Sequence, residues 1–136
     1  MTDAPSRPAA GASRVRRWGP LLAWATLLLV ATSWPNPSVP DVQGGDKAVH
    51  ATLYAVLAFL AARAVLWPEA ARPLPTAATL ALLVAAVSAF GWVDEWHQQF
   101  IPGRSRSVAD WQADTAGAAI GVVAATLLRR RDLRLT

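Results

Sequence analysis

Two stretches of the sequence hold most of the side chains that could do chemistry, and the first runs from Asp46 to Tyr54. In a helix, Asp46, His50 and Tyr54 are spaced by four residues and lie on one stripe, with Lys47 on the adjoining stripe. A carboxylate, an amine, an imidazole and a phenol on one side of a helix could face a single pocket. All four are therefore candidate site residues. The simpler alternative is that Asp46 only caps the helix and Lys47 extends its amine to water.

The second stretch begins at the end of an apolar run. Asp94 and Gln98 are spaced by four residues, as are Glu95 and Gln99, so a helix that continues past the apolar run would present two polar stripes. The dipeptide Pro102–Gly103 then predicts a turn that ends this helix. Adjacent carboxylates beside an apolar segment are costly to bury, which makes them candidates for a functional site.

A further helix is predicted after the turn. Ser107 and Asp110 form a capping-box pattern at its start. Asp110, Asp114, Gly117 and Gly121 then follow one another on one side of the helix. The GxxxG spacing of the two glycines lets a neighbouring backbone approach closely, so Asp114 should be drawn into a helix bundle.

These side chains predict an acid–base site with an anion-binding edge. Asp94, Glu95 and His50 are candidate acid or base groups, because burial and close neighbours tune such groups for proton transfer near neutral pH. Lys47 and Arg104 are candidate anion ligands, the first as a point charge and the second as a planar fork. Because we expect these two cations to pair with the carboxylates, we expect no metal and no other cofactor. The remaining candidate binding residues are Asp46, Tyr54, Gln98, Asp110 and Asp114.

The elements that position these residues are expected to cross a membrane. Of the 136 residues, 54% are hydrophobic and only 16% charged, with a mean hydropathy of +0.28, which is too apolar for an ordinary soluble domain. The apolar runs are Trp18–Ser33, Ala48–Trp67, Thr76–Val93 and Val108–Leu128. We predict an all-α integral membrane bundle of four transmembrane helices with short loops. The bundle would occupy residues 18–128, between a disordered cytoplasmic tail at 1–17 and a basic cytoplasmic tail at 129–136.

The basic residues predict the orientation in the cell membrane. Of the 13 Lys and Arg residues, ten lie on the side of the two termini, and three, Lys47, Arg104 and Arg106, lie on the other. Cytoplasmic segments carry the excess, so both termini should be cytoplasmic and both polar stretches should face outward. Nucleic acid is not expected as a partner, because the basic residues flank apolar runs instead of forming one face. A signal peptide at Trp18–Ser33 remains an alternative to a first span.

Three patterns occur in order along the chain: Asp46-Lys47-x-x-His50 with Tyr54; Asp94-Glu95-x-x-Gln98-x-Phe100-x-Pro102-Gly103-Arg104-x-x-Ser107-x-x-Asp110; and Gly117. From about Gly44 to Gly121, their order and spacing between apolar runs resemble the VanZ-like family of small bacterial membrane proteins. The resemblance implies a multi-helix membrane bundle and, for the founding type, low-level resistance to the lipoglycopeptide teicoplanin, but no settled reaction. One position departs from the pattern, because Asp114 stands where the family pattern has Asn.

Two functions fit these residues. The first is an outward-facing site within the lipid bilayer that binds or modifies an anionic lipid or cell-wall precursor. The second is a non-catalytic scaffold or accessory subunit whose polar clusters form a structural salt-bridge network. The outer side carries six acids against three bases, and this surplus favours a site. A transporter is less favoured, because the inner halves of the runs hold almost no polar residue except Arg63.

Overall fold

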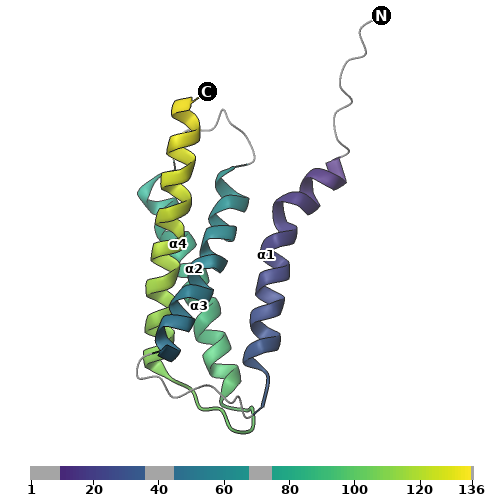
Figure 1. Cartoon of the computed structure of the whole chain (residues 1–136), viewed down its shortest axis with the longest axis vertical. Helices are drawn as coiled ribbons and strands as arrows, with labels where there is room; N and C mark the ends of the chain where they lie inside the picture. Colours follow the sequence, from purple (N-terminus) through teal and green to yellow (C-terminus); the bar gives the residue numbers. More distant parts are fainter. Residues whose placement is uncertain (1–9, 36–44, 68–74, 136) are drawn as a thin grey trace, which may run out of the picture.

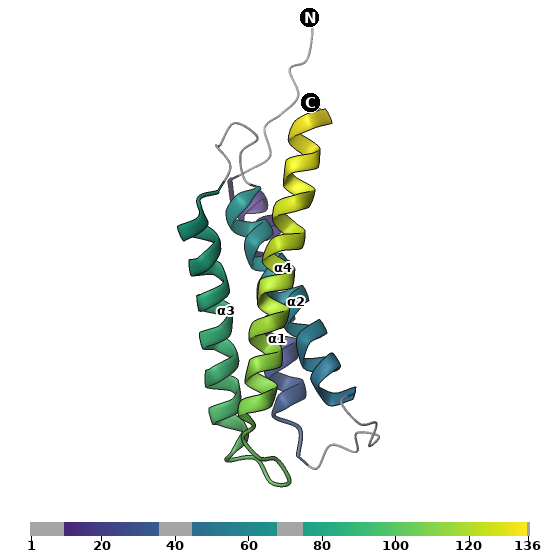
Figure 2. The ribbon, with the colours of Figure 1, turned by 90° about the vertical axis from the view of Figure 1, so that its left-hand side faces the viewer.

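The computed structural model describes residues 10–35, 45–67 and 75–135. Within these ranges it consists of the helices α1 (Ala10–Thr32), α2 (Gly45–Leu66), α3 (Ala77–Gln98) and α4 (Val108–Leu135), without strands. The helices run up and down beside one another, and the start of α1 and the end of α4 lie at the same end of the bundle (Figures 1 and 2). This architecture confirms the all-α prediction.

The helices extend beyond the apolar runs. The predicted tail at residues 1–17 is wrong for residues 10–17, which form the first turns of α1. Ala and Arg favour the helix, and backbone hydrogen bonding does not have to stop where the apolar residues stop. For the same reason α4 continues through the arginine cluster to Leu135. Residues 1–9 of the predicted tail and residues 36–44, between the first two apolar runs, lie outside the described residues.

The closest packing in the bundle is between α2 and α4, and glycines make it possible. A Cβ on Gly117 would lie 2.1 Å from the carbonyl oxygen of Ala51, and a Cβ on Gly121 would lie 2.1 Å from that of Ala55. Any side chain at either glycine would therefore collide with the α2 backbone. The GxxxG prediction is confirmed, and Asp114, one turn before Gly117, is drawn inward to 1% exposure.

The connection between α3 and α4 is a tight turn at the same end of the bundle as the start of α2 (Figures 1 and 2). Gly103 has a φ of 77°, in the left-handed region that favours glycine. The Ser107 hydroxyl accepts a hydrogen bond from the Asp110 backbone N–H at 3.2 Å, which caps α4 as the sequence predicts. The turn and the cap together fix where the second polar stretch re-enters the bundle.

Two of the helices, α2 and α3, are long and apolar enough to cross a membrane. Helix α1 falls short because Arg16 and Arg17 precede an apolar run of only about 16 residues, fewer than the roughly 20 that a span needs. Helix α4 contains Asp114 among small residues before its basic end. Length and composition therefore support membrane association through α2 and α3.

Candidate functional site

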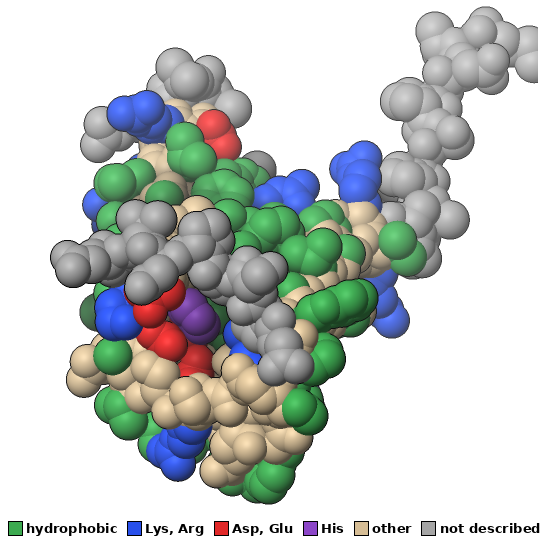
Figure 3. All heavy atoms as spheres, turned by 60° about the horizontal axis from the view of Figure 1, so that its bottom comes forward, with side chains coloured by type: hydrophobic (Ala, Val, Ile, Leu, Met, Phe, Trp, Pro, Cys, Tyr) green, Lys and Arg blue, Asp and Glu red, His purple; other side chains and the backbone are tan. Residues whose placement is uncertain are grey.

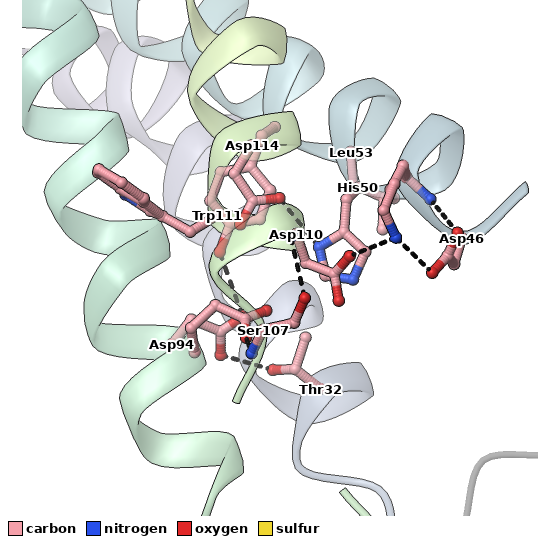
Figure 4. A network of polar contacts seen from close by, with 12 residues as sticks. Thr32, Asp46, His50, Leu53, Asp94, Ser107, Asp110, Trp111 and Asp114 are labelled. Atoms are coloured by element: carbon pink, nitrogen blue, oxygen red, sulfur yellow. Dashed lines mark hydrogen bonds and ion pairs between the residues drawn. The ribbon is translucent and has the colours of Figure 1, made fainter. Parts of the chain in front are cut away.

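The predicted site residues gather at the end of the bundle that carries the α3–α4 turn. Viewed onto this end, acidic side chains and a histidine lie together in a hollow of the surface, with basic side chains nearby (Figure 3). The close-up shows that the labelled acids and His50 come from α2, α3 and α4, with Thr32 of α1 beside Asp94 (Figure 4). The structure thus brings together the two polar stretches that the sequence separates by about forty residues.

The centre of the site is a carboxylate–imidazole pair. The His50 Nδ1 atom lies 2.9 Å from Asp114 Oδ1, and their side chains are 16% and 1% exposed. The pair joins α2 to α4 (Figure 4). The ligand atoms of His50, Glu95 and Asp114 all lie within 4.8 Å of one another. We refer to these three residues as the core triad.

Asp94 lies on α3 next to the core triad but belongs to a different network. Its Oδ1 accepts a hydrogen bond from the Thr32 hydroxyl at 2.7 Å, and its Oδ2 accepts one from the Tyr54 hydroxyl at 3.1 Å. The Gln98 amide nitrogen lies 3.4 Å from the same Oδ2. Asp94 is 1% exposed. Its donors come from α1, α2 and α3, so it ties three helices together.

Glu95 completes the cap of α4. Its Oε2 accepts a hydrogen bond from the Ser107 backbone N–H at 2.7 Å, and its Oε1 lies 3.4 Å from the Gln98 amide nitrogen. In a capping box the third residue of the helix would bind that Ser107 N–H. Here Glu95 takes over this bond from Asp110, whose carboxylate is left to contact Lys47.

Lys47 and Asp46 lie at the outer edge of the site, before the apolar run that starts at Ala48. The Lys47 amine lies 3.0 Å from Asp46 and 3.4 Å from Asp110, and its side chain is 47% exposed. Asp46 and Lys47 are therefore rim groups, at a distance from the core triad.

Arg104 contacts no carboxylate among the described residues. Its guanidinium donates to the backbone carbonyls of Ala31 and Trp34, at 3.1 and 3.4 Å, and lies 3.5 Å from the Gln98 Oε1 atom. It thereby binds the Ala31 carbonyl in the last turn of α1, which also accepts the Trp34 backbone N–H, and the Trp34 carbonyl just beyond the helix. Arg106 instead lies over the Trp92 ring, 4.0 Å from its centroid.

The sequence-based candidates therefore divide into three groups: the core triad, the Asp94 network with Tyr54 and Gln98, and a rim of Asp46, Lys47, Asp110 and Arg104. The expectation that Lys47 and Arg104 pair with all the carboxylates is wrong for the three buried acids, because the turn directs Arg104 to α1. Thr32 and the Ser107 backbone were missed as site groups. Thr32 lies in an apolar run and gives no sequence signal, whereas Ser107 was recognised only as a cap.

The fold and the site together define a class of protein: a small all-α bundle of apolar helices that carries a histidine and several buried acids at one end. The VanZ/LLP1 family model matches residues 11–129. The chain belongs to this family, which confirms the resemblance seen in the sequence. The match includes every candidate site residue. No curated protein and no solved structure is significantly similar to the chain.

Proposed function

We propose that this VanZ/LLP1 protein crosses the cell membrane four times and carries an outward-facing site that binds or modifies an anionic lipid-linked or cell-envelope molecule. The observation that carries the proposal is the core triad. Three ionisable side chains from three helices converge where a bundle needs only apolar packing, and such groups are costly to bury without a function. His50 keeps 16% of its side chain exposed, so a ligand can reach it.

The surface of the bundle supports four spans. Large apolar side chains are exposed on α1, α3 and α4, among them Leu22 (62%), Val30 (59%), Leu82 (70%), Ile120 (63%) and Val123 (55%). Contiguous exposed apolar surface is costly in water but suited to lipid. The arginines near the start of α1 and near the end of α4 are at the same end of the bundle, away from the site. Their location supports a cytoplasmic position for that end.

The geometry supports acid–base chemistry at His50. A buried carboxylate bonded to one ring nitrogen fixes the tautomer and orientation of an imidazole and stabilises its protonated form. Asp114 has this relation to His50. Lys47, half exposed beside His50 on α2, would attract the anionic group of a ligand to the site.

A scaffold function has one specific observation in its favour. Asp94 has hydrogen-bond donors on α1, α2 and α3, and Arg104 binds the end of α1. These contacts hold helices together and need no ligand. The hydrogen bonding of the core triad is incomplete, because the Asp114 Oδ2 atom is buried without a donor among the described residues. We therefore assign the Asp94 network to structure and the core triad to function.

Lipid co-purification from native membranes tests the proposal. The full chain, purified in a mild detergent, should carry an anionic lipid or wall precursor that mass spectrometry identifies. A Lys47→Gln variant should carry less of it, and a Lys47→Arg variant should carry as much as the wild type. If the wild type and Lys47→Gln carry the same lipids in the same amounts, the proposed anion site is wrong and the scaffold function is favoured.

A further inference from the structure

We propose that the core triad of His50, Glu95 and Asp114 binds a divalent first-row metal ion of the zinc or manganese type. The three residues come from α2, α3 and α4, and their ligand atoms lie within 4.8 Å of one another. Ligands about 2.1 Å from one ion are separated by roughly 3.0 to 4.2 Å. His50 Nδ1 and Asp114 Oδ1, at 2.9 Å, lie just below the lower end of this range, and the 4.8 Å limit that includes Glu95 lies just above its upper end.

A second observation points to a ligand at the same place. Asp114 is 1% exposed, and its Oδ2 atom is buried without a hydrogen-bond donor among the described residues. This oxygen lies close to Gly91, 3.1 Å from where a Cβ would stand. Gly91 is one turn before Glu95 on α3, so the unpartnered oxygen is directed toward the helix face that carries the third ligand. Burying a carboxylate oxygen without a hydrogen-bond donor costs free energy, and a bound cation would offset this cost.

The charge balance of the site agrees with a cation. Asp94, Glu95 and Asp114 are each 1% exposed, and in the described part of the chain no Lys or Arg forms an ion pair with them. Buried acids need a compensating charge, and His50 can supply at most one. One imidazole with two carboxylates is a donor set that zinc accepts and that also suits manganese.

The metal would replace the hydrogen bond between His50 and Asp114, because both atoms would then bind the ion, and the ion in place of the imidazole would carry the chemistry of the site. It also resolves a conflict in the proposed function. A cluster of buried acids repels an anionic ligand, whereas a metal ion held by a few carboxylates can use its open positions for phosphate oxygens. This link to an anionic ligand rests on the proposed function, but the metal site itself does not.

Metal content of the purified full chain tests the proposal. Protein in detergent is stripped with EDTA and incubated with ZnCl₂ or MnCl₂, passed through gel filtration, and its metal is counted by mass spectrometry. The wild type should retain about one ion per chain. Glu95→Gln and Asp114→Asn, which keep shape and lose charge, should bind at least about tenfold more weakly. Asp94→Asn is the matched control, because Asp94 is equally buried on α3 but outside the core triad, and it should keep the metal.

A spectroscopic measurement on the wild type gives evidence that does not depend on the folding of the carboxylate variants. Pulsed electron paramagnetic resonance of the Mn²⁺-loaded chain should detect the nitrogen of one coordinated imidazole. The signal should persist in His97→Asn and disappear in His50→Asn. A wild type that retains no zinc or manganese, or a nitrogen signal that depends on His97, overturns the proposal.

The two proposals fail separately in this design. Metal binding without any co-purified anionic lipid would leave the core triad as a metal site and refute the proposed ligand. Lipid binding by a chain that retains no metal would leave the proposed function and refute the metal site.

Discussion

At the scale of single residues, the acids of this protein differ in whether their oxygens have partners. Both oxygens of Asp94 accept hydrogen bonds, from Thr32 and Tyr54. Asp114 has one oxygen bonded to His50 and one without a donor among the described residues. The two carboxylates are buried to the same extent, so our assignment of Asp94 to structure and of Asp114 to the proposed site rests on this difference in hydrogen-bond partners.

The Thr32 hydroxyl should contribute more to the free energy of unfolding than an ordinary buried hydroxyl does. Thr32→Val removes a hydrogen bond to the buried Asp94 carboxylate and should lower the free energy of unfolding by about 1.5 to 3 kcal/mol. Thr126→Val is the control, because Thr126 is similarly buried and, within the described residues, its hydroxyl donates only to the Val122 carbonyl of its own helix. Denaturation in mixed detergent micelles measures both. Equal destabilisation would mean that the Asp94 contact contributes nothing specific.

Arg104 and Arg106 are two residues apart and should respond differently to the same change. Arg104→Lys keeps the charge and loses the fork that reaches α1 and Gln98, so contacts made by the guanidinium should weaken by about 1 to 3 kcal/mol. Arg106→Lys keeps a cation over Trp92 and should have little effect. Complementation of a deletion strain, scored by envelope lipid composition or lipoglycopeptide sensitivity, measures the difference at equal membrane abundance.

The control is the amount of the Arg104→Lys protein in the membrane, which shows whether the change affects folding. If Arg104→Lys accumulates to a lower level than Arg106→Lys, Arg104 acts through folding and the α1 contacts explain it. Equal complementation by both variants would show that the fork at position 104 is not needed.

At the scale of elements, the glycines of α4 set the distance to α2. Gly117→Ala and Gly121→Ala each place a Cβ against a backbone carbonyl, at Ala51 and Ala55, where nothing flexible can yield. Either change should destabilise the bundle by about 1 to 3 kcal/mol or more, because the helices must separate. The loss should appear as a lower melting temperature in detergent.

Gly19→Ala on α1 is the matched control. Among the described residues its Cβ would meet only Val15, at an ordinary 3.8 Å, and Ala favours the helix over Gly by about 1 kcal/mol. Gly19→Ala should therefore be neutral or stabilising. If all three variants melt at the wild-type temperature, the close α2–α4 packing is refuted.

At the scale of the whole molecule, α4 runs along the bundle, so the α3–α4 turn and the end of α4 lie at opposite ends (Figure 1). The sequence has no cysteine, so introduced cysteines have no background. Ser105 in the turn and Arg131 near the end of α4 are both exposed on the protein surface. In intact cells an impermeant maleimide should therefore label Ser105→Cys outside and spare Arg131→Cys inside, because the membrane shields the second position. Permeabilised cells should label both. The reverse pattern in intact cells would invert the proposed topology.

The sequence by itself determined the helices, the turn between α3 and α4, the α4 cap and the close glycine contact. These are local properties: apolar run length, Pro102–Gly103, Ser107 with Asp110, and the GxxxG spacing act within a few residues of where they stand. The same locality explains why helix ends were less accurate. Charged residues end an apolar run but do not end a helix, so α1 begins at Ala10 and α4 ends at Leu135.

Only the tertiary structure decided which acid meets which partner. Spacing placed His50 and Asp114 each on a polar stripe, yet their 2.9 Å contact depends on how closely α2 approaches α4. Arg104 was expected beside the carboxylates and instead binds the end of α1, a helix more than seventy residues away. Thr32 gave no signal within its apolar run. Such pairings depend on helix rotation and depth in the bundle, and packing over the whole chain fixes these quantities.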